Sequence, residues 1–230
     1  MTENILPLTV QTLRGKYPIR YSAKNLFCLG FTGRNKALVL KHMEEAREIG
    51  IICQGVSVPL VLPVSPARLT TGSTIHVEHE KTSGEVEYVI LVDGSRTYVA
   101  VGSDHTDREM EKHDLKESKD AVPKIMSSTV WLYEEVEDHW DELIMRSWIR
   151  SQGNMELYQD GKLELLLKWN DLISIIKDHI GEELSGTIVF AGTIPTIKRQ
   201  MLFTDTWKLE MFDPVLKRSL KSEYTVRIIS

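Results

Sequence analysis

Three carboxylates in the middle of the chain have types and spacing that favour chemistry. Glu85 and Glu87 open the segment EVEYVILV, and Asp104 follows the segment TYVAVG. Side chains two positions apart on a strand point to the same face, with their Cα atoms about 6.6 Å apart. The two glutamates can therefore converge on one point, and a hairpin brings Asp104 to the same end of the strand pair.

Three carboxylates at one point are unfavourable unless something neutralises them. Like charges about 4 Å apart repel by about 1–4 kcal/mol, depending on the effective dielectric. A shared proton or a bound cation relieves this repulsion. Because every ligand atom is an oxygen, the set suits Mg²⁺ or Mn²⁺ better than Zn²⁺. The alternative is the solvated face of a half-buried sheet, on which an E-x-E pair is common.

The pattern around the carboxylates predicts mostly strands. Strands are expected over 85–92 and 97–102, joined by the turn signal Asp93-Gly94, and a further one over 74–78. Before them, apolar residues on one face predict a helix over 34–49 that ends at Gly50. Prolines within 51–70 indicate extended or loop backbone.

The rest of the chain is expected to add strands and two larger helices. Mixed charges over 104–120 predict a short helix followed by a loop. Residues 134–150 predict an amphipathic helix, whose stripe is Val136, Trp140, Leu143, Ile144, Ser147 and Trp148. Asn170-Asp171 is expected to cap another helix, which runs to about His179. The remaining expected strands cover 5–13, 18–32, 186–191, 207–212 and 224–229. This order predicts an α+β fold and not an alternating βαβ series.

Composition limits the classes of function. The 230 residues are 42% hydrophobic with a net charge of -5, which suits one sizeable core. The scattered basic residues give no footprint for nucleic acid, and no apolar stretch approaches the ~20 residues that cross a bilayer. Cys28 and Cys53 are expected to be reduced thiols. With no signal peptide recognised, the predicted location is the cytoplasm.

The motifs, taken in order, resemble the fumarylacetoacetate-hydrolase-like superfamily. In that superfamily an E-x-E strand is followed, after a hairpin, by a motif similar to the segment Asp104 to Arg108 (DHTDR). Other segments similar to superfamily motifs are Gly33-Arg34-Asn35 with Glu48-Ile49-Gly50, Pro59 to Pro66, Lys119-Asp120 with Pro123 and Trp131, and Ala191-Gly192-Thr193-Ile194-Pro195. The phrases SGEVE, GSDHTDRE and VEDHWDELIMRSWI look like a prokaryotic family within it, of the DUF2848 kind.

The resemblance implies a fold and an assembly. The fold is expected to be α+β, a mixed β-roll of the fumarylacetoacetate-hydrolase-like type with a small N-terminal α/β lobe. One domain spans 1–230, with the lobe over 1–58 and the catalytic β-roll with two helices over 59–230. A homodimer is expected, because relatives of this superfamily are usually dimers or larger.

The resemblance also implies roles for single residues. The metal ligands are Glu85, Glu87 and Asp104, which would bind Mg²⁺ or Mn²⁺. Substrate binding falls to Thr106, Gly192 and Thr193, although Ile194 splits the usual Thr-Pro pair. Arg108 and Lys119 would hold substrate charge, with Lys116 as the alternative lysine. The candidates for a general base are His42, Glu45 and His105.

The implied activity is that of a divalent-metal-dependent hydrolase. It would cleave a C–C bond of a small oxo acid or 1,3-dicarbonyl through a metal-stabilised enolate. An oxo-acid decarboxylase or tautomerase on the same site is the first alternative. The second is a non-catalytic oligomeric binding protein, in which the split Thr-Pro pair and the absence of a clean His match mark a lost active site.

Overall fold

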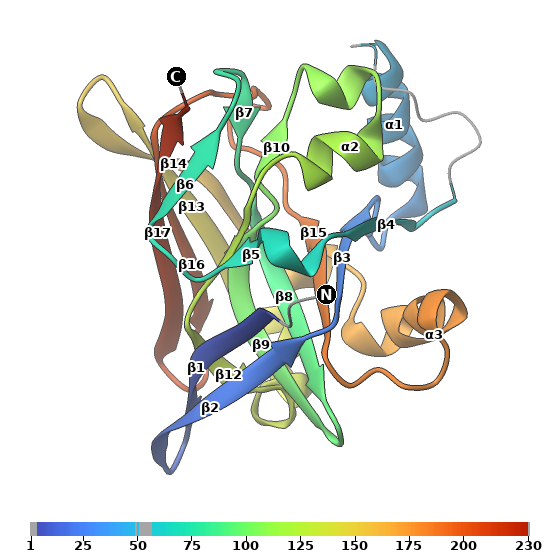
Figure 1. The fold of residues 1–230 in the computed structure, drawn as a ribbon, viewed down its shortest axis with the longest axis vertical. Coiled ribbons are helices and arrows are strands. Elements are labelled where there is room, and N and C mark those ends of the chain that lie inside the picture. The colour runs from blue at the N-terminus through green and yellow to red at the C-terminus, as the bar shows by residue number, and fades with distance from the viewer. Residues whose placement is uncertain (1–3, 49, 51–56, 230) are drawn as a thin grey trace.

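The computed structural model describes residues 4–48, 50 and 57–229, in which two large β-sheets pack together (Figure 1). The predicted α+β class with a fumarylacetoacetate-hydrolase-like roll is confirmed. Cys53 and Ile49 lie outside the described residues. No helix in the described ranges is long and apolar enough to cross a membrane.

The larger sheet has ten strands and contains the predicted hairpin. Its main path runs through β2 (Gly15–Ala23), β1 (Asn4–Thr12), β12 (Thr129–Leu132), β9 (Arg96–Ser103), β8 (Val86–Asp93), β15 (Thr187–Thr193), β3 (Asn25–Gly30) and β4 (Leu60–Val64). Off this path, β11 (Lys124–Met126) pairs with β9 and with β5 (Leu69–Thr70). The N-terminal strands therefore join the sheet that carries the hairpin, and the division at residue 58 stays a prediction.

The smaller sheet has five strands, and the remaining elements connect or cover the sheets. Its order is β14 (Asn154–Lys162), β13 (Ile144–Ser151), β16 (Thr206–Asp213), β17 (Arg218–Ile228) and β6 (Thr74–Val77). A separate short pair joins β7 (Thr82–Ser83) to β10 (Thr106–Asp107). The helices are α1 (Lys36–Glu48), α2 (Leu115–Asp120) and α3 (Trp169–Ile180). The 3₁₀ turns are η1 (Pro66–Arg68), η2 (Met110–Lys112), η3 (Tyr133–Glu135), η4 (Glu137–Glu142) and η5 (Leu163–Leu165).

The hairpin β8–β9 is buried on both faces, which explains its continuous apolar sequence. Tyr88 and Ile90 pack in one cluster with Trp207 of the smaller sheet. Val89 and Leu91, one position along, belong to the opposite cluster, which contains the inward residues of β1 and β2. The period-2 alternation of a strand thus places the hairpin between two cores.

The amphipathic helix predicted over residues 134–150 is wrong. The structure has the turns η3 and η4 there, followed by β13. Met145, Ser147 and Ile149 are buried while their neighbours are more exposed, so the burial follows period 2. Pairing with β14 and β16 on both sides decides the conformation, and this nonlocal contact overrides the local helical stripe. β14 was not predicted either.

The other predicted elements agree with the structure in type, with one reversal. The helix expected over 34–49 is α1, the helix expected near 170–179 is α3, and the Asp93-Gly94 turn joins β8 to β9. Residues 104–120 were expected to form a helix and then a loop. Instead, a short strand and a 3₁₀ turn come first, and α2 closes the segment.

Gly102 near the end of β9 allows three elements to meet beside the predicted site. A Cβ there would lie 2.5 Å from the Ile125 carbonyl oxygen, 2.7 Å from Phe190 and 2.8 Å from Val89. We therefore expect Gly102→Ala to destabilise the protein by about 1–3 kcal/mol through overpacking. Gly30→Ala is the control, because the nearest atom to its added Cβ is a Leu60 side-chain carbon at 3.5 Å. Urea unfolding of both variants measures the difference, and equal stabilities would contradict this account of Gly102.

Candidate metal centre

The three predicted carboxylates meet at the open end of the hairpin. Glu87 on β8 is in register with Gly102, so Asp104 follows directly beyond the paired end of β9. One carboxylate oxygen from each of Glu85, Glu87 and Asp104 lies within 4.8 Å of the other two. Among the residues that the structure describes, this is the one such group of three potential metal ligands. The predicted convergence is confirmed, and the role as metal ligands stays a prediction.

Burial makes the negative charges of this acidic triad (Glu85, Glu87 and Asp104) energetically unfavourable. Glu87 and Asp104 are almost fully buried, whereas the side chain of Glu85 is 24% exposed, so the triad opens to solvent past Glu85. Burial and the charge of Asp104 raise the pKa of Glu87 well above its ordinary value. Burial also acts to raise the pKa of Asp104, but the cations Lys119 and Lys124 outweigh it and lower that pKa.

Lys119, rather than Lys116, reaches the triad. Its Nζ forms an ion pair with Asp104 Oδ2 and donates a hydrogen bond to Thr106 Oγ1 over 3.0 Å. Thr106 in turn donates to the Asp104 carbonyl oxygen over 2.6 Å. Lys116 lies on the exposed side of α2. The structure therefore favours Lys119 of the two lysines that the sequence left open.

Arg108 is buried and fixes the position of Glu85. Its guanidinium donates to Glu85 Oε1 over 2.7 Å, to Ser83 Oγ over 2.7 Å and to Glu111 Oε2 over 2.9 Å. Although burial acts in the opposite direction, the charges of Glu85 and Glu111 raise the pKa of Arg108. Sequence reasoning missed Glu111, and its i+3 spacing from Arg108 was the signal that could have found it.

Sequence reasoning also missed Lys124, a fully buried lysine on β11. Its Nζ donates to the carbonyl oxygen of His105, and its charge contributes to the low pKa of Asp104. Burial lowers the pKa of Lys124 to about 8. A single lysine next to an apolar dipeptide gives no periodic signal, so only the packing of β11 against β9 and β5 reveals it.

His105 is buried beneath the triad with both ring nitrogens occupied. Nδ1 shares a hydrogen bond with Tyr224 Oη over 2.9 Å, and Nε2 shares one with Thr82 Oγ1 over 2.9 Å. Burial and the nearby Lys124 lower its pKa well below the ordinary value, which keeps the imidazole neutral. Its ring packs edge-on against Trp207 and Tyr224. This environment favours a structural role for His105 over proton transfer with a substrate.

Gly192 and Thr193 support the strand that carries Glu87. A bulge in β15 lets the Gly192 N–H donate to Glu87 Oε2 over 2.9 Å. Gly192 has φ +110°, and a Cβ there would lie 1.9 Å from Thr32 Oγ1, so only glycine fits. Thr193 Oγ1 donates to the Val86 carbonyl over 2.8 Å. Both residues thus contact β8 directly, and their predicted contact with a substrate stays a prediction.

The other two candidate bases lie on the surface of α1. The side chains of His42 and Glu45 are 72% and 48% exposed and lie 3.7 Å apart. Glu45 also pairs with Lys41 over 3.7 Å, and His42 packs against the Phe31 ring; none of these described contacts reaches the triad. Their role as a general base stays a prediction.

The site also fits a hard cation on its own geometry. Asp104 Oδ1 is buried and has no hydrogen-bond partner, although a buried carboxylate oxygen normally has one. Octahedral Mg²⁺ holds ligand oxygens at about 2.1 Å, which places them about 3–4 Å from one another. The triad oxygens all lie within 4.8 Å of one another, so small side-chain movements would bring them to that spacing. The unpaired Oδ1 and the all-oxygen donor set are what a bound Mg²⁺ or Mn²⁺ requires.

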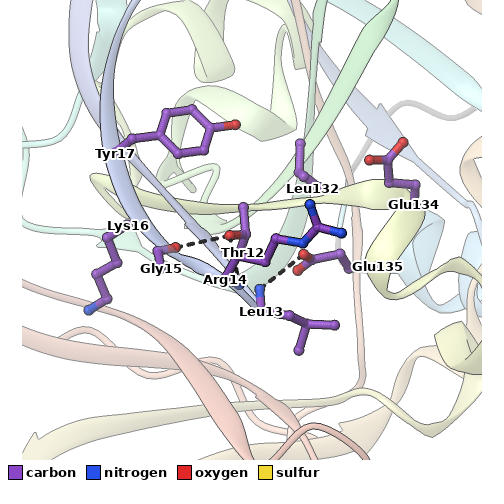
Figure 2. A pocket seen from close by; sticks show the side chains of 9 residues that line it. All are labelled: Thr12, Leu13, Arg14, Gly15, Lys16, Tyr17, Leu132, Glu134 and Glu135. Atoms are coloured by element: carbon purple, nitrogen blue, oxygen red, sulfur yellow. Dashed lines mark hydrogen bonds between the residues drawn. The ribbon is translucent and has the colours of Figure 1, made fainter.

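A separate surface hollow of about 610 Å³ lies at the tip of the β1–β2 hairpin (Figure 2). Its lining is Thr12, Leu13, Arg14, Gly15, Lys16, Tyr17, Leu132, Glu134 and Glu135. Glu135 ties the hairpin to η3 by accepting a hydrogen bond from the Leu13 N–H over 3.0 Å. None of the triad carboxylates lines this hollow.

The chain belongs to the family DUF2848, described as a protein of unknown function, whose model matches residues 29–224. This match confirms the resemblance to DUF2848 found in the sequence. The fold is of the fumarylacetoacetate-hydrolase-like type. No curated protein matches the chain.

Several solved structures share the fold. Cg1458 superposes with a TM-score of 0.65 at 11% identity, covering 98% of this chain and 100% of that one. A 2-keto-3-deoxyarabinonate dehydratase gives 0.60 at 13% identity, covering 90% and 75%. A 2-keto-3-deoxy-D-arabinonate dehydratase complexed with magnesium and 2,5-dioxopentanoate gives 0.58 at 15% identity, covering 89% and 74%. At such identities the likeness concerns the fold alone.

The contact between Lys119 and Asp104 predicts a difference between two lysines of the same helix. We expect Lys119→Met to destabilise the metal-free protein by roughly 3 kcal/mol, because it leaves a buried carboxylate without its counter-charge. Lys116→Met removes an exposed lysine and should change stability by less than about 0.5 kcal/mol. Urea unfolding in the presence of a chelator measures both variants. Equal stabilities would show that the ion pair contributes nothing.

Proposed function

We propose that this protein is a divalent-metal-dependent enzyme that acts on a small oxo acid or 1,3-dicarbonyl compound. The observation that carries the proposal is the triad itself, in which a buried, unpartnered Asp104 oxygen faces no donor of the chain. The cations Arg108 and Lys119 beside the triad add the charge that an anionic substrate needs. An acid-binding metal enzyme requires both features together.

The chain's own residues have distinct parts in this proposal. Glu85, Glu87 and Asp104 would hold Mg²⁺ or Mn²⁺, which supplies Lewis-acid polarisation of the substrate oxygens when bound. The Gly192 N–H orients Glu87, and Arg108 orients Glu85. These contacts keep the ligands fixed before substrate arrives, so little reorganisation is needed during reaction.

Charge that develops on the substrate is stabilised by the cations that border the open side. Lys119 has a flexible stem and a partly exposed side chain, which suits it to bind a substrate carboxylate. Arg108 is held by three partners and acts as a fixed positive charge. His105 is a positioning residue in this scheme, because its nitrogens are occupied. His42 or Glu45 could act as the base only if α1 approached the triad.

We favour hydrolysis of a C–C bond next to the oxo group, with decarboxylation or tautomerisation as the alternative on the same site. All three reactions build negative charge on the carbon next to a carbonyl, which the same cations stabilise. The related solved structure complexed with magnesium and 2,5-dioxopentanoate supports the oxo-acid class. The unpartnered oxygen of Asp104 favours an intact site over a non-catalytic binding protein. A cytoplasmic homodimer remains part of the proposal.

Calorimetric titration with Mg²⁺ and Mn²⁺ tests the metal site. We expect one ion per chain for the native protein, and at least a tenfold loss of affinity for Glu87→Gln, which removes a charged ligand. Glu80→Gln is the matched control, because Glu80 is exposed and outside the triad, and it should bind as the native chain does. Absence of binding by the native chain at millimolar concentration would refute the metal-enzyme proposal.

Deuterium incorporation into 2-oxo acids tests the chemistry. With metal present, the protein should exchange protons on the carbon next to the oxo group in D₂O, and Glu87→Gln should not. NMR of 2,4-dioxo acids and of oxo acids with a β-carboxylate separates hydrolysis, which yields two acids, from decarboxylation, which removes one carbon. A native protein that binds metal but exchanges and converts none of these acids would support the binding-protein alternative.

A further inference from the structure

The ammonium group of Lys119 contacts one triad carboxylate directly. It pairs with Asp104 Oδ2 and donates to Thr106 Oγ1 over 3.0 Å. The other oxygen of that carboxylate, Oδ1, is buried without a partner. One oxygen of Asp104 is therefore paired with a lysine of the chain, whereas the other has no partner and can accept a bound metal cation.

Helix α2 holds the backbone of Lys119 in place, whereas the ammonium group is held by side-chain contacts with Asp104 and Thr106. The Asp114 side chain caps the helix by accepting from the Glu117 N–H over 2.8 Å. The Asp120 side chain accepts from the Ser65 N–H over 2.8 Å, which ties the end of α2 to the segment after β4. Ser118 is fully buried. The helix is thus anchored, and the four-carbon stem of Lys119 supplies the mobility.

Of the three cations that act on Asp104, Lys119 is the one best able to give way. Lys124 is enclosed with no exposed surface, and Arg108 is 8% exposed with three fixed partners. The Lys119 side chain is 12% exposed, and Glu85 of the triad is 24% exposed. A divalent ion placed beside these cations would repel all three, and only Lys119 has space toward solvent.

We propose that Lys119 is a resident counter-cation that a divalent ion displaces from Asp104, and that its freed ammonium then binds the substrate carboxylate. This inference rests on the proposed metal-dependent function. In the metal-free protein Lys119 offsets the buried charge of Asp104, so the site stays folded before loading. Metal and anionic substrate then favour the same displaced position of Lys119, so each strengthens the binding of the other.

Magnesium titration of two lysine variants tests the displacement. Lys119→Met should bind Mg²⁺ at least tenfold more tightly than the native chain, because no ammonium has to leave Asp104. Lys116→Met is the control and should bind as the native chain does. Native-like or weaker binding by a folded Lys119→Met would overturn the inference.

Amine labelling of the unaltered protein gives a second readout that does not depend on a variant's folding. We expect acylation of Lys119, followed by mass spectrometry, to rise several-fold at saturating Mg²⁺, with Lys116 unchanged as the internal reference. Constant labelling of Lys119 while calorimetry records bound Mg²⁺ would also overturn the inference.

The two proposals fail in distinguishable ways. If neither the native chain nor folded Lys119→Met binds Mg²⁺, the proposed function falls and the inference with it. If the native chain binds and Lys119→Met binds no more tightly, only the inference falls. If Lys119→Met alone binds, both proposals fall, because the ion then does not displace Lys119 from Asp104 in the native chain.

Discussion

The burial of two carboxylates side by side at the end of one hairpin is the constraint on which the site depends. Glu87 and Asp104 are almost inaccessible to solvent, so water cannot relieve their repulsion. The protein meets this constraint with backbone and side-chain donors from separate elements. Gly192 of β15 donates to Glu87, and Lys119 of α2 pairs with Asp104. The ligand positions are consequently fixed by the whole fold rather than by the hairpin alone.

The two-sheet architecture provides the rigid support that this constraint needs. The hairpin lies between two apolar clusters, so β8 and β9 cannot shift register without exposing one of them. Beneath the triad, His105 links Tyr224 of the smaller sheet to Thr82 of β7. Tyr224 also donates to Ser103 at the end of β9. This buried polar network joins both sheets to the loop that carries Asp104.

The three cationic side chains around the triad differ in how firmly the fold encloses them, and this difference determines which of them can change partners. Lys124 is fully buried, Arg108 is held by three hydrogen-bond partners, and the Lys119 side chain is 12% exposed. Fixed charges stabilise the ligands, whereas a mobile one can exchange partners when a metal or a substrate arrives. The same positive charge thereby serves the metal-free fold and the proposed chemistry.

The sequence by itself determined the features that depend on short spacing. The i, i+2 relation of Glu85 and Glu87 and the Asp93-Gly94 turn fix the hairpin locally, so the triad could be predicted, and so could the α+β class. Only the tertiary structure decided the conformation of 134–150, which local periodicity misassigned as a helix, since pairing of β13 with two distant strands governs it. It also decided the choice of Lys119 over Lys116 and the enclosure of His105. These depend on which distant elements pack around each side chain, and no spacing along the chain encodes that.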